Sequence, residues 1–156
     1  GRMKSAYYVA TVVSAYRAAL DSYMKDPENY EFKQEWYDEL CKASHREFTH
    51  GFFYQKPSSR DQNYLTSDYV REYSFIGVVL GVDETTGETI VQQRNKFCVG
   101  DEIEIMSPGE PFYTEEVPSM KDEDGNAIES APHPKQEVRI PFRNVPAKYS
   151  ILRKRK

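Results

Sequence analysis

The spacing of apolar residues changes once along this chain, and that change limits the folds the chain can adopt. Up to about residue 54 the apolar side chains recur every three or four positions, which is typical of amphipathic helices. After residue 69 they recur every second position in short runs separated by turn residues, which is typical of strands. The sequence therefore predicts a helical segment followed by a mainly-β segment.

Two helices are expected in residues 1–54. The first begins after Ser5, a good N-cap, and ends at Asp26 and Pro27. The second runs from about residue 31 to residue 44. The apolar stripe of the first helix consists of Tyr8, Val9, Val12, Val13, Tyr16, Ala19, Leu20 and Tyr23, and that of the second consists of Phe32, Trp36, Tyr37, Leu40 and Cys41. The short connection predicts an antiparallel pair. Because such a pair cannot bury both stripes by itself, we expect it to pack on a surface outside this chain or on the rest of the chain.

Residues 55–68 are rich in polar side chains and predict a linker. Residues 69–156 contain six or more short strand candidates separated by turns, with no helical pattern between them. Such a series predicts a small antiparallel β-barrel, because closure of the sheet removes exposed strand edges. The expected domains are thus a helical pair at 1–54, a linker at 55–68 and a C-terminal β-barrel at 69–156.

Basic residues are concentrated at the C-terminal end. The whole chain has 21 Lys and Arg against 25 Asp and Glu, yet residues 139–156 hold seven basic residues and no acidic one. A basic end on an acidic body can bind nucleic acid, or it can be a solvated tail that aids solubility. The candidate RNA-binding residues are Arg2, Lys4, His45, Arg46, Arg153, Lys154, Arg155 and Lys156.

Catalytic and metal motifs are weak in this sequence. It has no glycine-rich phosphate loop and no Gly-x-Ser-x-Gly elbow. Cys41, His45 and His50 lie within ten residues and could begin a zinc site, but no fourth ligand is evident and Cys41 also fits the apolar stripe of its helix. Cys98 follows two basic residues and is either a weak nucleophile candidate or an inert thiol. We therefore predict no catalytic residue, no metal and no cofactor in this part of the protein.

The sequence also limits the compartment. It has no run of roughly 18 apolar residues, so we expect no membrane span. With two cysteines and no signal peptide, a reducing cytoplasmic setting is expected.

Three segments in register resemble a known family. They are residues 1–8 with 16–21, residues 44–52, and residues 75–77 with 95–108. In this order and spacing they resemble the C-terminal part of the collagenase-like U32 peptidase family, and within it the branch of prephenate-dependent tRNA uridine hydroxylases. The resemblance implies an N-terminal catalytic domain outside this chain, with either peptidase activity or tRNA hydroxylation. It also implies that tRNA is a possible partner.

The β segment also resembles the second domain of translation elongation factors, in which a Val-Gly-Asp turn precedes an alternating strand. Gly100 can adopt a positive φ, and Asp101 can accept hydrogen bonds from the turn backbone. We therefore interpret five residues as determinants of the fold: Asn95, Lys96, Phe97, Gly100 and Asp101.

These observations lead to one hypothesis and two alternatives. The chain is a non-catalytic accessory module that helps to position tRNA for hydroxylation of the wobble uridine. Alternatively, it is the C-terminal part of a collagenase-like protease, or an interaction module that docks the missing catalytic domain through its helix stripe.

Overall fold

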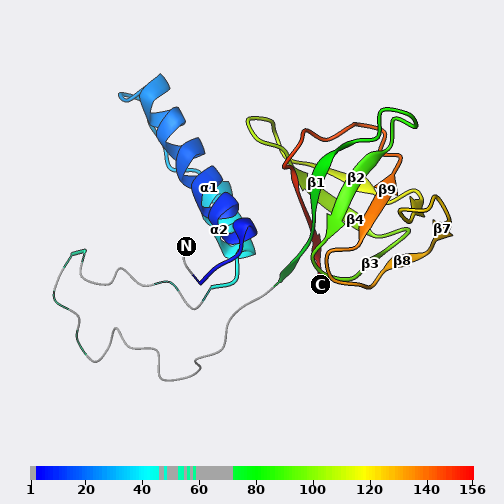
Figure 1. Ribbon diagram of the computed structural model, residues 1–156. Helices are drawn as coiled ribbons and strands as arrows, with labels where there is room; N and C mark the ends of the chain where they lie inside the picture. Colours follow the sequence, from blue (N-terminus) through cyan, green and yellow to red (C-terminus); the bar gives the residue numbers. More distant parts are fainter. Residues whose placement is uncertain (1–2, 46–47, 49–52, 55, 57, 59–71) are drawn as a thin grey trace. The chain divides into compact units, whose positions relative to one another are not determined.

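The chain forms two compact units, Gly1–Glu72 and Tyr73–Lys156, in a computed structural model (Figure 1). The structure describes residues 3–45, 48, 53–54, 56, 58 and 72–156. The predicted linker 55–68 therefore lies almost entirely outside the described residues. The two units are described separately below.

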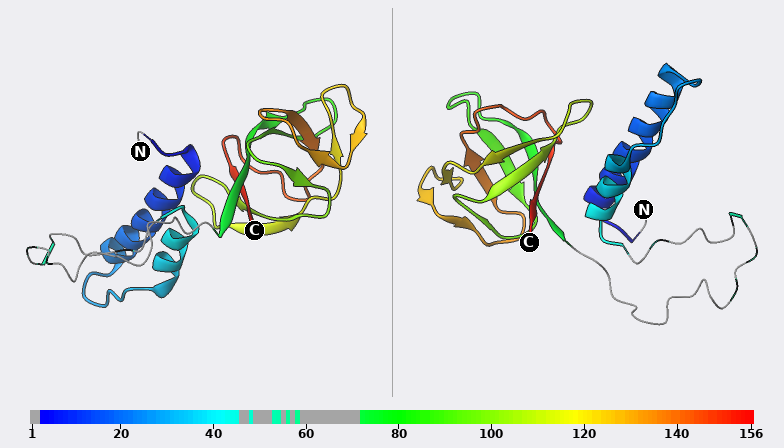
Figure 2. Two further views of the ribbon diagram at one scale, coloured as in Figure 1. Left: turned by 90° about the horizontal axis from the view of Figure 1, so that it is seen from below. Right: turned by 180° about the vertical axis from the view of Figure 1, so that it is seen from behind.

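The first unit contains two antiparallel helices, as predicted. Helix α1 spans Ala6–Lys25, and the Ser5 side chain caps it by accepting a hydrogen bond from the Tyr8 backbone N–H at 3.3 Å. Helix α2 spans Gln34–Lys42, so it is shorter than expected because Lys33, the residue before it, is extended. The second helix returns alongside the first (Figure 2).

The helices pack through one side of α1, on which two of the three buried side chains are small. Tyr7, Thr11 and Ala15, spaced four apart, are buried there. Small residues such as Thr11 and Ala15 let two helix backbones approach closely. Trp36 of α2 and Ala43, the residue that follows α2, are buried as well. The Tyr7 hydroxyl donates a 2.8 Å hydrogen bond to the backbone carbonyl of Lys42, which fixes the two helices against each other.

The second unit is an antiparallel sheet. Its strands are β1 (Tyr73–Val82), β2 (Thr89–Gln93), β3 (Phe97–Cys98), β4 (Glu102–Met106), β5 (Tyr113–Glu116), β6 (Met120–Lys121), β7 (Ala127–Ile128), β8 (Ser130–Ala131), β9 (Glu137–Ile140) and β10 (Ile151–Arg155). Eight of them form one sheet in the order β5-β4-β10-β1-β2-β9-β6-β7, and β3 pairs with β8. The C-terminal strand β10 is thus an interior strand of the sheet.

Strand β1 bends the sheet. Its register shifts between Phe75 and Gly77 against β10, and between Val79 and Gly81 against β2. Bulges of this kind increase the local twist and curl a sheet. A Cβ on Gly77 would lie 2.7 Å from Cγ1 of Val91, so the first bulge requires glycine.

The curled sheet is a half-barrel, which corrects the expected closed barrel. The edge strands of the larger sheet are β5 and β7. Backbone bonds from the β3–β4 turn bridge the two ends: Gly100 donates to Val117 at 2.9 Å, and Val99 donates to Glu129 at 3.0 Å. The prediction of a mainly-β, antiparallel unit preceded by a helix pair is confirmed.

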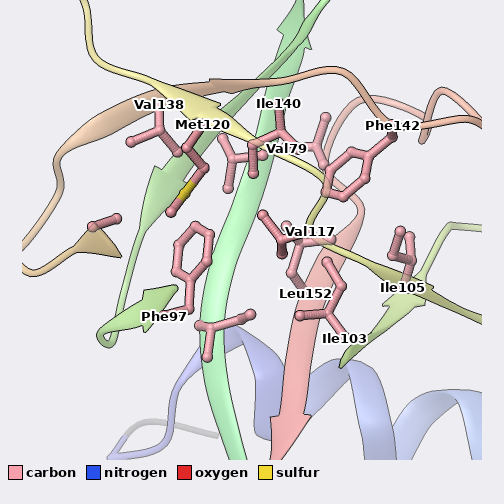
Figure 3. Close-up of a cluster of buried hydrophobic side chains, with 13 residues drawn as sticks. Val79, Phe97, Ile103, Ile105, Val117, Met120, Val138, Ile140, Phe142 and Leu152 are labelled. Atoms are coloured by element: carbon pink, nitrogen blue, oxygen red, sulfur yellow. The ribbon is translucent and has the colours of Figure 1, made fainter. Parts of the chain in front are cut away.

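A single hydrophobic core fills the concave side of the sheet (Figure 3). Ile103 and Ile105 are both fully buried, and the glutamates that alternate with them point to the other face. The remaining buried core members are Ile76, Val79, Val91, Phe97, Val117, Met120, Ala131, Val138, Ile140, Phe142 and Leu152.

Candidate functional site

Three of the seven basic residues near the C-terminus are neutralised inside the β unit. Arg139 donates from Nε to Asp83 at 3.0 Å, and Lys154 lies 2.6 Å from the Asp101 carboxylate. Arg153 forms an ion pair with Glu104. The predicted basic tail is therefore in part a hydrogen-bonded strand with its own carboxylate partners.

Arg153 differs most from the sequence-based expectation of an RNA-binding side chain. It is 0% exposed, and its guanidinium carbon lies 5.3 Å from the Tyr73 ring centroid and 5.6 Å from that of Phe112. The two rings and the Glu104 carboxylate surround the cation. Arg153 is thus a structural residue of the sheet, because a buried and paired guanidinium cannot reach a phosphate.

Four other basic residues of the same segment are exposed. Arg143 and Lys148 lie in the loop between β9 and β10, and Arg155 and Lys156 lie at the end of β10. Among the described residues, no carboxylate is assigned to any of these four as an ion-pair partner. Lys148 precedes β10 and Arg155 ends it, at about 13 Å from the first residue of the strand at about 3.3 Å per residue. Arg143 lies earlier in the loop, where Glu115 of β5 accepts a hydrogen bond from its backbone N–H.

The candidate residues of the helical unit are only partly described. Arg2 and Arg46 lie outside the described residues. The Lys4 ammonium lies 5.0 Å from the centroid of the Tyr8 ring. His45 stacks on Phe48 with ring centroids 4.5 Å apart, and its Nδ1 lies 2.8 Å from the Ala43 carbonyl. Lys4 and His45 belong to the first unit, whereas the basic residues of 139–156 belong to the second.

An apolar face covers most of the length of α1, on the side opposite the buried residues. Its exposed members are Val9, Val13, Tyr16, Leu20, Tyr23 and Met24. A groove of about 470 Å³ adjoins this face at Tyr16 and is lined further by Tyr8, Val12, Tyr37, Leu40, Ala43, His45 and Phe48. We call the six exposed residues of α1 together the α1 face. The predicted stripe is thus present, but most of it is not buried within the first unit.

The five turn residues surround the β3–β4 connection and the start of β3. Gly100 has φ of +82°, which favours glycine, and Asp101 accepts a 2.7 Å hydrogen bond from the Cys98 backbone N–H. The Asn95 side chain donates to the Phe75 carbonyl at 2.6 Å. Phe97 is fully buried, whereas Lys96 is exposed.

Neither cysteine is disulfide-bonded, and burial raises the pKa of the Cys41 thiol above its ordinary value. A raised pKa disfavours the thiolate that a nucleophile or a zinc ligand requires. Within the described part of the chain, no group of three or more His, Cys, Asp or Glu side chains is placed to hold a metal ion. His50, the third member of the candidate zinc set, lies outside that part. Neither described helix is long and apolar enough to cross a membrane.

Sequence reasoning missed Tyr149, which is 65% exposed and has φ of +71°. The sequence indicated only the positive charge around this residue, since Tyr149 follows Lys148 in a stretch without acidic residues.

Comparisons with known proteins divide the chain in the same order as its two units. Residues 1–63 match the model of peptidase family U32, and residues 71–153 match that of the peptidase family U32 C-terminal domain. The tRNA hydroxylation protein P1 of Bacillus subtilis (strain 168) is 42% identical over 140 residues, covering 90% of this chain and 33% of that protein. The tRNA hydroxylation protein P of Escherichia coli (strain K12) is 31% identical over 156 residues, covering 97% and 33%.

A solved structure, the C-terminal domain of a U32 peptidase from Geobacillus thermoleovorans, is 40% identical with a TM-score of 0.49 and covers 53% of this chain and 92% of that one. The chain spans about a third of the length of the curated relatives named above.

The match to the C-terminal domain extends over more than half of the chain, and residues 1–63 match the model of peptidase family U32. The resemblance drawn from the three sequence segments is therefore confirmed, and the chain belongs to peptidase family U32.

Proposed function

We propose that this chain is an accessory module of a U32 family protein, without catalytic residues or a cofactor of its own. Its β unit helps to hold tRNA while another part of the protein hydroxylates the wobble uridine. The observation that carries this proposal is the set of four exposed basic side chains on the β unit, Arg143, Lys148, Arg155 and Lys156. The names of the tRNA hydroxylation relatives support it. A tRNA partner also agrees with the cytoplasmic location expected from the sequence.

The charge arrangement suits a phosphate backbone better than a second protein of mixed charge. Arg155 and Lys156 project from the end of a central strand, and Arg143 and Lys148 from the loop at its other end. Each exposed cation can neutralise one phosphate and release a condensed counterion. Because Lys148 precedes β10 whereas Arg155 and Lys156 lie at its other end, the cations at the two ends would contact separate phosphates.

A filter-binding titration of the chain with unmodified tRNA at several NaCl concentrations tests this proposal. The double substitution Arg155→Gln with Lys156→Gln should lower the slope of log affinity against log salt by about 1.4–1.8, since each phosphate contact contributes roughly 0.7–0.9. Lys25→Gln, in the last turn of α1, is the control and should leave the slope unchanged. An unaltered slope in the double variant would contradict the role of these two residues.

A second function, docking of the rest of the U32 protein, is favoured by the α1 face. Val13 is 58% exposed, Tyr16 68% and Met24 69%. A contiguous patch of several exposed apolar side chains marks an interaction site in soluble proteins. Residues 1–63 match one U32 model, and the relatives extend well beyond the matched third, so the occupant we propose is the remainder of the U32 domain.

The docking proposal predicts a difference between the chain and the full-length protein. Val13→Asp with Leu20→Asp should change the stability of the chain by less than about 0.5 kcal/mol per site, as exposed positions usually do. In the full-length protein the same pair should cost at least about 3 kcal/mol, because it would bury two unpaired charges. Ala18→Asp, an exposed position on the other side of α1, is the matched control and should have a small effect in both. Equal effects of the double variant in the two proteins would contradict docking.

A further inference from the structure

Tyr149 holds a backbone conformation that its side chain does not favour. Its φ of +71° lies in the left-handed region, which bulky residues rarely adopt and which glycine adopts freely. Burial does not offset this strain, because the side chain is 65% exposed. Tyr149 is the third residue of a turn closed by the 3.0 Å bond from the Ser150 N–H to the Ala147 carbonyl, a position that requires a positive φ in a type II turn. Residues held in such conformations are over-represented at functional positions.

The core of the β unit fixes this conformation. The Tyr149 N–H donates to the Val79 carbonyl at 2.8 Å, and the Val79 N–H donates to the Ser150 carbonyl at 2.9 Å. The Ser150 hydroxyl donates to the Ala147 carbonyl at 2.6 Å and lies 2.7 Å from the Ser107 hydroxyl. Since Val79 is fully buried in the core, the backbone that carries the ring is rigid.

The start of the same loop is also held in place. The Glu115 carboxylate accepts hydrogen bonds from the backbone N–H groups of Arg143 and Asn144, and the Tyr113 hydroxyl donates to the Asn144 carbonyl at 3.2 Å. The loop is therefore anchored at both ends, and its exposed side chains project from a fixed base.

The charges beside the ring are positive. The Lys148 ammonium lies 5.2 Å from the Tyr149 ring centroid, within the range of a cation–π contact. Residues 141–149 contain Arg143 and Lys148 and no acidic residue, although the β unit as a whole has more acidic than basic residues. The acidic residue Glu115 contacts this loop. Its carboxylate oxygens accept hydrogen bonds from the backbone N–H groups of Arg143 and Asn144.

We propose that the Tyr149 ring is a stacking platform for one unpaired nucleobase of RNA, with Lys148 and Arg143 contacting the flanking phosphates. The inference rests on the proposed function and adds a base contact to its phosphate contacts. An exposed, preorganised ring beside cations is the arrangement with which proteins bind single-stranded nucleic acid, and stacking of this kind tolerates any base. The unpaired bases of a tRNA loop are ligands of this chemistry.

Binding of two short RNAs to the chain tests this inference. One is an oligouridylate of about eight nucleotides, and the other is an abasic oligomer of the same length and charge. The chain should bind the base-bearing oligomer roughly 5- to 150-fold more tightly, the range expected for one stacked base. Tyr149→Ala should abolish that preference and Tyr149→Phe should keep it. Lys148→Gln should weaken both oligomers equally and lower the salt slope by about 1.

Tyr149→Gly keeps the test valid if the alanine variant is unstable. Glycine relieves the positive φ, so this variant should unfold at a temperature no lower than the original chain and should still lose the base preference. A base preference that survives Tyr149→Gly would overturn the inference. Equal binding of the two oligomers by the original chain, with tRNA still bound, would overturn the stacking site and leave the proposed function standing. Failure of the chain to bind tRNA at all would overturn both.

Discussion

Replacing Arg153 by methionine should destabilise the β unit without weakening the proposed contact with RNA. In the sequence this arginine belongs to the basic cluster, but in the structure it is 0% exposed and is paired with Glu104. Methionine retains much of the hydrocarbon volume and removes only the cation. The substitution therefore isolates the role of the charge.

The expected loss of stability follows from the surroundings of the ion pair. Removing one partner of a buried pair costs about 3–5 kcal/mol, because the other charge is left uncompensated. The Glu104 side chain is 21% exposed and can be partly rehydrated. We therefore expect the free energy of unfolding to fall by the lower value of that range, about 3 kcal/mol. The Tyr73 and Phe112 rings lose their cation–π contacts as well. In a unit of this size 1 kcal/mol shifts the unfolding midpoint by about 4–8 °C, so we expect a fall of roughly 12–24 °C.

A double-mutant cycle measured by urea unfolding provides the assay. Glu104→Gln removes the charge that Arg153→Met leaves behind, so the double variant should be more stable than Arg153→Met alone by about 1–3 kcal/mol. At a temperature where all variants are folded, their tRNA affinity and its salt slope should equal those of the original chain. A loss below about 0.5 kcal/mol in Arg153→Met, together with a shallower salt slope, would refute the structural role and return Arg153 to the RNA contacts.

Three further outcomes are expected. Gly77→Ala should cost about 1–3 kcal/mol in thermal unfolding, because its Cβ would lie 2.7 Å from Cγ1 of Val91, and a change within error would contradict the tight bulge. The pKa of Asp83 is lowered chiefly by the hydrogen bond from Arg139, so its contribution to stability is present above about pH 4 and is lost as the pH falls through the lower folded value. Asp83→Asn should therefore reduce the loss of stability on acidification. An unchanged loss would contradict a stabilising Asp83–Arg139 ion pair. The Cys41 thiol, whose pKa is raised by burial, should react with iodoacetamide at pH 7 more slowly than free cysteine, and a faster reaction would contradict its burial.

Local signals in the sequence predicted both the helices and the sheet. Ser5 marks the start of α1, and Asp26 with Pro27 marks its end, because caps and proline act on the nearest backbone. The alternation around Ile103 and Ile105 predicted which side of β4 faces the core. The sequence could not show that the barrel stays open, because closure depends on how much β1 bends at its bulges and on the pairing of distant edge strands.

The buried side of α1 was predicted less well, for a physical reason. An apolar stripe reports the surface that a helix buries in the whole protein, including surfaces outside this chain. Within the chain, α2 packs on the side where Thr11 and Ala15 permit close approach, and a stripe of large residues gives no such access. The mismatch between the predicted stripe and the side buried within the first unit agrees with the docking proposed above for the α1 face.

The basic cluster shows why a charge count along the chain does not locate a binding surface. Successive side chains of a strand point to opposite faces, so neighbouring basic residues of β10 have different surroundings. Leu152 faces the core, whereas Arg153 lies opposite Glu104 on the other face and is covered by aromatic rings. The exposed cations lie in the loop with Tyr149 and at the end of β10, where Arg155 is the last paired residue and Lys156 follows it. Because a positive φ at a tyrosine is set by the bonds of Val79 and Ser150 rather than by the residue type, the sequence could indicate the charge of that loop but not the rigidity of its ring.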